Sequence, residues 1–150
     1  MNILIVDDEP SYLRLLDVSF RLEGWTVYTA SDGQQGLKHL SETRMDLIIS
    51  DIYMPVMDGL KLHAKVRELP DYKTTPFIFV SGYKDQNTLS AISKTANDTF
   101  VEKTNPLSFL KEWVYYLITP IEKRPALPPV EKPSQTYDRR MRDDTYHRRR

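Results

Sequence analysis

The sequence predicts an α/β fold built on a doubly wound parallel sheet. Short apolar runs alternate with segments of helical periodicity along the first 121 residues. The first run, Ile3–Val6, is continuously aliphatic, which is typical of a parallel strand covered on both faces. Alternation of this kind implies right-handed crossovers, and the common flavodoxin-like strand order for such a chain is 2-1-3-4-5. We therefore expect a five-stranded parallel sheet with five helices.

The first half of the domain contains residues that mark helix boundaries. Pro10 suits the first turn of a helix, and Gly24 suits the position just past its end. The pair Asp32-Gly33 opens the next helix. The elements expected here, in order, are a strand at Ile3–Val6, a helix at Pro10–Glu23, a strand at Trp25–Thr29, a helix at 32–42 and a strand at Asp46–Ser50.

The second half continues the alternation. Asp58-Gly59 precedes a helix that Pro70 ends, and Pro106 starts the last helix. The helical pattern between these two is weaker and more polar. The elements expected here are a helix from Gly59 to Pro70, a strand at Pro76–Val80, a helix at Asp85–Thr95, a strand at Thr99–Glu102 and a helix at Pro106–Ile118.

Composition and charge limit the class of protein. The 150 residues include no cysteine, which excludes disulfides, thiol catalysis and cysteine-ligated metals. We find no membrane span and no signal peptide, so we expect a cytoplasmic protein. Residues 1–121 carry 12 basic and 16 acidic side chains, whereas residues 122–150 carry 9 and 5 and begin in a proline-rich stretch. We therefore predict a domain at 1–121, followed at 122–150 by a Pro-rich linker and a basic, disordered tail.

Polar side chains follow four of the expected strands: Asp7-Asp8-Glu9, Asp51, Ser81 and Lys103. In the order 2-1-3-4-5, ligands bind beyond the carboxyl ends of the strands, at the switch point between strands 1 and 3. Three close carboxylates need a compensating cation, and an oxygen-only donor set indicates Mg²⁺. A carboxylate beside Mg²⁺ and a lysine is also a workable nucleophile toward phosphorus, forming an acyl phosphate.

These residues closely resemble the receiver domain of two-component response regulators, in a single-domain form. The resemblance runs from Ile3 to about Ile118 and rests on four motifs in order and at the family's spacing. The motifs are Ile3-Leu4-Ile5-Val6-Asp7-Asp8-Glu9-Pro10, Asp51-Ile52-Tyr53-Met54-Pro55-Val56-Met57-Asp58-Gly59, Phe79-Val80-Ser81-Gly82 and Phe100-Val101-Glu102-Lys103.

The resemblance implies a role for each site residue. Asp51 would accept the phosphoryl group, Lys103 would contact its oxygens, and Ser81 would be the switch hydroxyl. Phe100 would be the switch aromatic, although an ordinary core aromatic is an equal alternative. Members of the family are phosphorylated by histidine kinases or small phosphodonors and lose the group by slow hydrolysis, so we expect no enzymatic turnover beyond this. The implied Mg²⁺ ligands are Asp8 directly, Asp7 largely through water, Asp51, and the backbone carbonyl of Tyr53.

The sequence departs from the family pattern near the site. The family's lysine normally precedes a proline, often through a cis bond, whereas Lys103 precedes Thr104. A cis bond there would cost about 3 kcal/mol, so we expect a different loop path. Tyr53 and Tyr83 should flank the phosphoryl site, and we hypothesise that they shield the acyl phosphate from water. The alternative is that both rings lie on the surface or contact a partner.

The last predicted helix carries two apolar stripes. Leu107, Leu110, Val114 and Leu117 form the expected core face, and Phe109, Trp113 and Tyr116 form a second stripe. We interpret Trp113 and Tyr116 as a partner or homodimer surface. The alternative is a thick core edge that packs under the tail.

The leading functional prediction is a single-domain response regulator. It would take phosphate from a sensor histidine kinase or phosphotransfer protein, and would act on a downstream protein through the face formed by residues 85–95, 99–102 and 106–118. No DNA-binding module fits after residue 121. The main alternative is a receiver-like docking or dimerisation module that works without phosphorylation. A Mg²⁺-dependent phosphohydrolase ranks last, because such enzymes usually place a second acid where this chain has Tyr53.

Overall fold

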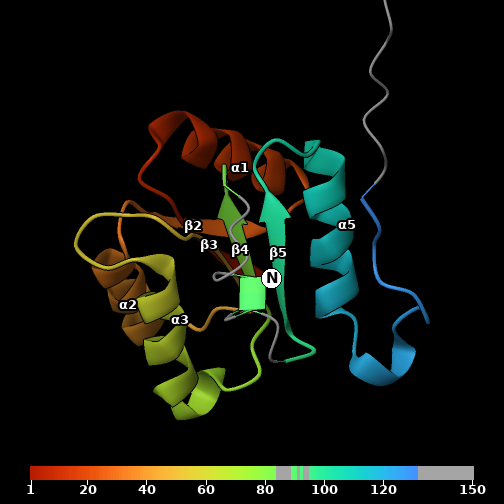
Figure 1. Ribbon diagram of the computed structural model, residues 1–150. Coiled ribbons are helices and arrows are strands. Elements are labelled where there is room, and N and C mark those ends of the chain that lie inside the picture. The colour runs from red at the N-terminus through yellow and green to blue at the C-terminus, as the bar shows by residue number, and fades with distance from the viewer. Residues whose placement is uncertain (84–88, 91, 93–94, 132–150) are drawn as a thin grey trace, which may run out of the picture.

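Five parallel strands form the centre of the domain in this computed structural model, in the order β2-β1-β3-β4-β5 (Figure 1). The structure describes residues 1–83, 89–90, 92 and 95–131. Strand β1 pairs with β2 on one side and with β3 on the other, which places the switch point between β1 and β3. The predicted fold class and strand order are confirmed. The strands are β1 (Asn2–Val6), β2 (Thr26–Ala30), β3 (Leu47–Asp51), β4 (Phe77–Ser81) and β5 (Asp98–Glu102).

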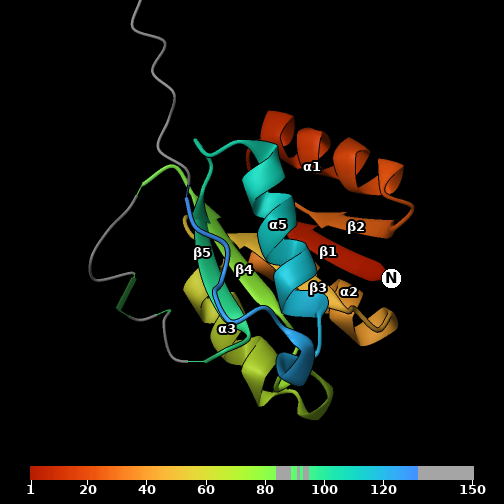
Figure 2. The same cartoon turned by 90° about the vertical axis from the view of Figure 1, so that its right-hand side faces the viewer.

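Helices cover both faces of the sheet (Figures 1 and 2). One face carries α1 (Pro10–Leu22) and α5 (Leu107–Ile118), and the other carries α2 (Gly33–Glu42) and α3 (Gly59–Glu68). Two short 3-10 helices, η1 (Pro70–Tyr72) and η2 (Ile121–Lys123), follow α3 and α5. The predicted helix at Asp85–Thr95 lies largely outside the described residues.

Local chemistry explains where these helices begin and end. Pro10 occupies the start of α1, where its missing N–H costs nothing. Gly24 follows the end of α1 with a φ of 86°, a conformation that favours glycine. Asp32 and Asp58 cap α2 and α3, because each side chain accepts a hydrogen bond from a first-turn backbone N–H.

The sheet separates two hydrophobic clusters. Ile3 and Ile5 belong to the cluster beneath α1 and α5, whereas Leu4 and Val6 belong to the cluster beneath α2 and α3. Successive side chains of a strand point to opposite faces, so each face needs its own apolar residues. This explains why the Ile3–Val6 run contains no polar residue.

The start of β5 is fixed by a buried carboxylate. Asp98 accepts hydrogen bonds from His63 Nε2 at 3.1 Å, Arg67 Nη2 at 2.5 Å and Thr95 Oγ1 at 2.8 Å. Burial opposes ionisation of Asp98, but these donors and the Arg67 charge outweigh it and lower its pKa. The strand that leads to Lys103 is thereby tied to α3.

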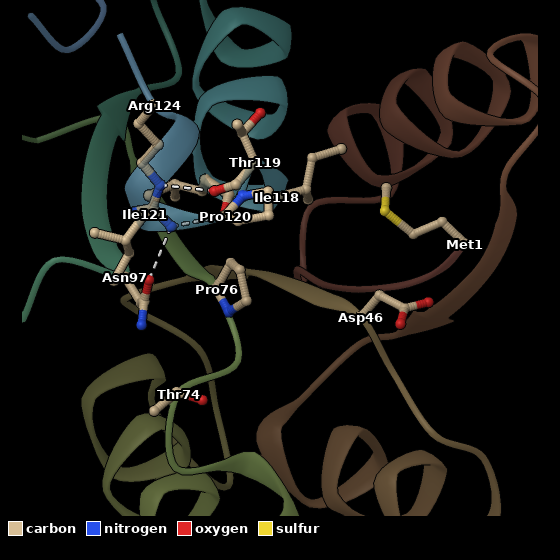
Figure 3. Close-up of a pocket in the computed structure, with 11 residues that line it drawn as sticks. Met1, Asp46, Thr74, Pro76, Asn97, Ile118, Thr119, Pro120, Ile121 and Arg124 are labelled. Atoms are coloured by element: carbon tan, nitrogen blue, oxygen red, sulfur yellow. Dashed lines mark hydrogen bonds between the residues drawn. The ribbon is translucent and has the colours of Figure 1, made fainter. Parts of the chain in front are cut away.

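The chain beyond α5 remains in contact with the domain through Arg124. Its guanidinium donates to the carbonyls of Thr119, Leu117 and Ala96 and to Asn97 Oδ1, each at 2.8–2.9 Å. Figure 3 shows the bonds to Thr119 and Asn97. The boundary at residue 121 stays a prediction, but these contacts continue to residue 124. They tie the end of α5 to the turn that precedes β5.

A cavity of about 640 Å³ lies beside Arg124 (Figure 3). Met1, Asp46, Pro76 and Asn97 line it, and each immediately precedes a strand. The cavity therefore sits at the amino ends of the strands, at the edge of the sheet opposite the predicted site.

Candidate functional site

Four strands deliver the predicted side chains to one edge of the sheet. Asp7 directly follows β1 and Lys103 directly follows β5, whereas Asp51 and Ser81 are the last residues of β3 and β4. The carboxyl ends of parallel strands meet at the same edge, which is why residues so distant in sequence meet here. Asp7 is 0% exposed, Asp51 6% and Ser81 1%, so the strand-end groups are held inside the protein.

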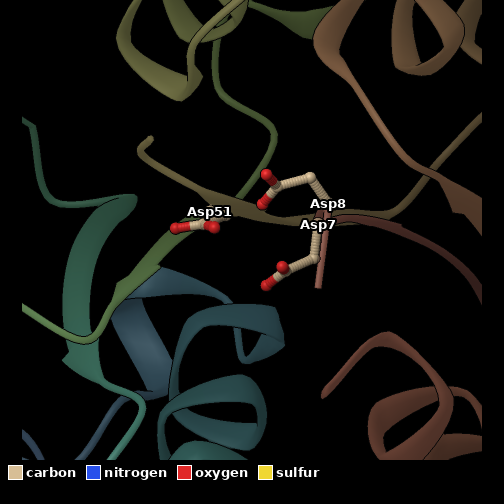
Figure 4. A group of neighbouring side chains, drawn as sticks. All are labelled: Asp7, Asp8 and Asp51. Carbon is tan, nitrogen blue, oxygen red and sulfur yellow. The ribbon is translucent and has the colours of Figure 1, made fainter. Parts of the chain in front are cut away.

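Asp7, Asp8 and Asp51 form an acidic cluster (Figure 4). Each offers one carboxylate oxygen, and the three oxygens lie within 4.8 Å of one another. The backbone orients the two buried carboxylates, since Glu9 N–H donates to Asp7 Oδ1 and Ile52 N–H donates to Asp51 Oδ1, both at 2.8 Å. Within the described residues, buried Asp7 Oδ2 accepts no well-aligned hydrogen bond. Three carboxylates that converge in this way, with oxygen as the only donor atom, fit a Mg²⁺ ion.

Lys103 supplies positive charge to this cluster. Its Nζ lies 2.8 Å from Asp7 Oδ2 and 3.2 Å from Asp51 Oδ2 and from Glu9 Oε2. The contact with Asp7 Oδ2 is close enough for an ion pair although its alignment is poor for a hydrogen bond. The Lys103 N–H donates to the Ser81 carbonyl at 2.9 Å, which fixes the backbone beside β4. All peptide bonds of the described residues are trans, so the Lys103–Thr104 loop follows a path without the cis bond.

Burial and mutual repulsion perturb the acids. Burial raises the pKa of Asp51 to about 6, with repulsion from Asp7 as the next cause, against the opposing effect of Lys103. Burial also raises the pKa of Asp7. For Lys103 burial acts in the opposite sense, but the contact and charge of Asp7 and the charge of Asp51 outweigh it and raise the pKa of the ammonium. Lys103 is therefore charged whenever the acids ionise.

The loop between β3 and α3 leads into a glycine at position 59, the first residue of α3, where no other residue fits. Gly59 N–H donates to the Ile52 carbonyl at 2.7 Å, and a Cβ on this residue would overlap the Asp51 carbonyl oxygen. Val56 in the same loop has a φ of 67°, a rare conformation for a β-branched residue. The backbone behind Asp51 is thus tightly constrained.

Tyr12 is a site residue that the sequence reasoning missed. Its ring centroid lies 4.8 Å from Lys103 Nζ, within the range of a cation–π contact. Its position early in the helix that follows Asp7-Asp8-Glu9 is a weak signal, because no sequence pattern indicates which residue of that helix faces a lysine 91 positions later. The sequence places Glu9 at the end of the first strand, but it carries no signal for the contact of Glu9 with Lys103.

The remaining predicted residues take varied positions. Ser81 Oγ is buried and accepts a hydrogen bond from Tyr83 N–H at 3.2 Å. Phe100 is partly buried and packs against the cluster beneath α2 and α3. Tyr53 and Tyr83 are 51% and 76% exposed, as the surface alternative expects, and the shielding hypothesis stays a prediction. The metal-ligand role of the Tyr53 carbonyl stays a prediction.

Trp113 and Tyr116 are partly buried. Both pack against the cluster beneath α1 and α5, and their rings meet edge to face with centroids 5.5 Å apart. The guanidinium of Arg124 lies over the Tyr116 ring, 5.4 Å from its centroid. Part of the second stripe is therefore packed under the chain that follows α5, as the structural alternative expected.

Comparison with known proteins agrees with this geometry. Residues 3–115 match the profile of the response regulator receiver domain family. Two solved structures illustrate the likeness. The chemotaxis protein CheY4 of Vibrio cholerae is 31% identical with a TM-score of 0.68, covering 73% of this chain and 92% of its own. The response regulator protein TrrA of Thermotoga maritima, in complex with Mg²⁺ and BeF, is 34% identical with a TM-score of 0.67, covering 77% and 97%.

Curated relatives extend the comparison by sequence. An uncharacterised protein of Leptolyngbya boryana is 34% identical over 112 residues, covering 74% of this chain and 86% of that protein. The response regulator GtcR of Aneurinibacillus migulanus is 31% identical over 106 residues, covering 71% of this chain and 43% of its own. The chain spans only 15% of the transcriptional regulatory protein GlrR of Escherichia coli.

None of the helices in the described part of the chain has the length and apolar character that a bilayer crossing needs.

Proposed function

Because the chain belongs to the response regulator receiver domain family, we propose that Asp51 accepts a phosphoryl group, with Mg²⁺, from a sensor histidine kinase or phosphotransfer protein. The observation that supports this most is the Asp51 carboxylate, which lies among two further carboxylates and 3.2 Å from the Lys103 ammonium. Receiver domains are signalling modules rather than enzymes, so the proposed product is a changed protein surface. The protein would act as a single-domain response regulator.

The proposed transfer uses the unprotonated Asp51 carboxylate. With a pKa of about 6, most of Asp51 is ionised at neutral pH. One of its oxygens attacks phosphorus, an O–P bond forms, and the bond from phosphorus to the donor breaks with its electron pair leaving on the donor. Lys103 offsets charge on the phosphoryl oxygens, and Ser81 supplies the hydroxyl that turns toward them. Asp7, Asp8 and Asp51 would hold Mg²⁺, which supplies further charge neutralisation.

An apolar stripe on α1 supports a protein as the phosphodonor. Leu15, Val18 and Leu22 are 49%, 50% and 84% exposed, and their spacing places them on one face of the helix. This helix begins three residues after Asp7, so the stripe starts near the proposed acceptor and runs away from it toward Leu22. We assign this stripe to the contact with the kinase or phosphotransfer protein.

The proposed output is a population shift in the face that contains β5 and α5. Ser81 would move toward the phosphoryl group, and Phe100 would turn inward behind it. Trp113 and Tyr116 would then contact a downstream protein or a second copy of the chain. Since Arg124 lies over Tyr116, such a partner would have to displace or include the segment after α5.

Incubation with acetyl phosphate and Mg²⁺ tests the acceptor. We expect acid-labile phosphate in the wild type, none in Asp51→Ala, and none in the wild type after chelation of Mg²⁺. Asp71→Ala, which removes an exposed carboxylate of η1, is the matched control and should be labelled normally. Equal labelling of Asp51→Ala, or no labelling of the wild type, would contradict the proposal and favour a docking module that works without phosphate.

A further inference from the structure

The Lys103 ammonium faces two different kinds of group. The carboxylates of Asp7, Glu9 and Asp51 lie 2.8–3.2 Å from it, and the ring of Tyr12 lies against it with its centroid 4.8 Å away. The Lys103 side chain is only 13% exposed. A cation that is largely removed from water gains most from an aromatic face.

The Tyr12 ring is anchored independently of the acids. It projects from α1 and packs against the cluster beneath α1 and α5. Burial raises the pKa of its hydroxyl to about 12, so the side chain stays neutral. Because this packing and not a charge holds the ring, its position does not depend on the charge state of the carboxylates.

The carboxylates cannot fix the position of the Lys103 ammonium at every step of the proposed reaction. Asp7 and Asp51 are groups that would bind Mg²⁺, and an Asp51 oxygen would carry the phosphoryl group. When these oxygens are engaged, Lys103 loses part of the negative charge that fixes it now. A neutral ring binds no metal and leaves the full charge of the ammonium available to phosphoryl oxygens.

We infer that Tyr12 is a positioning residue, whose ring holds the Lys103 ammonium in place for the phosphoryl group after Mg²⁺ has engaged the acids. The inference rests on the proposed function. The aromatic ring of Tyr12, and not its hydroxyl, would position the ammonium. Tyr12 would therefore matter for binding the phosphoryl group but not for binding Mg²⁺.

Two affinities test this inference: that for Mg²⁺ alone, and that for beryllofluoride, a phosphoryl mimic, at saturating Mg²⁺. Both are measured by titration calorimetry on the full chain. In Tyr12→Leu and Tyr12→Met we expect the beryllofluoride affinity to fall about tenfold, which corresponds to about 1.4 kcal/mol, while the Mg²⁺ affinity is unchanged. Tyr12→Phe and Tyr12→Trp should retain wild-type values for both.

A matched control and a metal-free readout distinguish positioning from packing. Leu13 packs against the same cluster as Tyr12, so Leu13→Ala loosens α1 without touching the ammonium and should leave both affinities unchanged. In the metal-free protein, ring-current effects should move the NMR signals of the Lys103 ε-methylene upfield in the wild type and in Tyr12→Phe.

Each result that differs from these expectations overturns one part of the inference. An equal fall in both affinities in Tyr12→Leu would show a packing role, and failure of Tyr12→Phe would show that the hydroxyl acts. Unchanged beryllofluoride binding in Tyr12→Leu would overturn this inference alone. A wild type that binds no beryllofluoride with Mg²⁺ would overturn the proposed function and this inference with it.

Discussion

Replacing Lys103 with methionine removes the cation from the acidic cluster while keeping an unbranched side chain. In the wild type, the charge of Lys103 opposes the burial and repulsion that raise the pKa of Asp51 to about 6. Without it, the pKa values of Asp51 and Asp7 rise further. The folded variant then binds more protons than the unfolded chain above the ordinary Asp pKa of 3.8. Its free energy of unfolding therefore falls as pH rises.

The size of the loss follows from burial and from the ease of protonation. Removing one partner of a buried ion pair costs about 3–5 kcal/mol, and Lys103 and Asp7 are 13% and 0% exposed as side chains. Protonation of an acid limits the cost, because one pKa unit is worth about 1.4 kcal/mol. We expect a loss of about 3 kcal/mol near pH 7.5 and about 1 kcal/mol near pH 5.5. The pKa of Lys103 is raised above its ordinary value of 10.5, so Lys103 stays charged between pH 5.5 and 7.5. Its own titration therefore adds nothing to the pH dependence of the wild-type stability.

Urea unfolding at both pH values, with and without Mg²⁺, measures this difference. The gap between wild type and Lys103→Met should widen with pH and narrow when Mg²⁺ replaces the missing charge. Lys111→Met is the matched control, since Lys111 of α5 pairs with Glu23 at the end of α1, away from the acidic cluster, and should lose far less stability. A gap that is the same at both pH values and unaffected by Mg²⁺ would refute the reasoning.

Three further substitutions test separate parts of the structure. Gly59→Ala should lower the free energy of unfolding by about 1–3 kcal/mol and weaken Mg²⁺ binding in calorimetry, because its Cβ would overlap the Asp51 carbonyl; normal Mg²⁺ affinity would contradict this. Asp98→Asn should cost about 3 kcal/mol at neutral pH. The folded pKa of Asp98 is lowered, so the stability that its ionised form contributes is lost as the pH falls below 3.8. The difference between wild type and variant should therefore shrink in acid, and a difference that is the same at every pH would contradict this. Arg124→Ala should cost about 2 kcal/mol and speed hydrogen exchange at Asn97 amides; unchanged exchange would show that the contacts of Figure 3 contribute little.

Much of the site could be predicted because parallel strands impose a simple rule. Once the strand order is fixed, residues at the carboxyl ends must share an edge. Asp7, Asp51, Ser81 and Lys103 therefore meet even though the sequence separates them widely. Only the type of residue at each strand end was needed.

Other contacts could not be predicted because they depend on side-chain packing between distant elements. The Tyr12 ring meets Lys103 only through the way α1 packs beside the end of β5. Arg124 lies in a segment whose prolines and charges indicate a linker, and its carbonyl partners carry no sequence signal. The exposed rings of Tyr53 and Tyr83 likewise depend on loop conformation, which composition does not specify.

Location of the phosphoryl group within the chain tests the central claim most directly. After incubation with acetyl phosphate and Mg²⁺, borohydride reduction converts a phosphorylated aspartate to homoserine, which peptide mass spectrometry can place. We predict homoserine at position 51 alone. Homoserine at another acidic residue, or no conversion although beryllofluoride and Mg²⁺ bind, would contradict Asp51 as the acceptor.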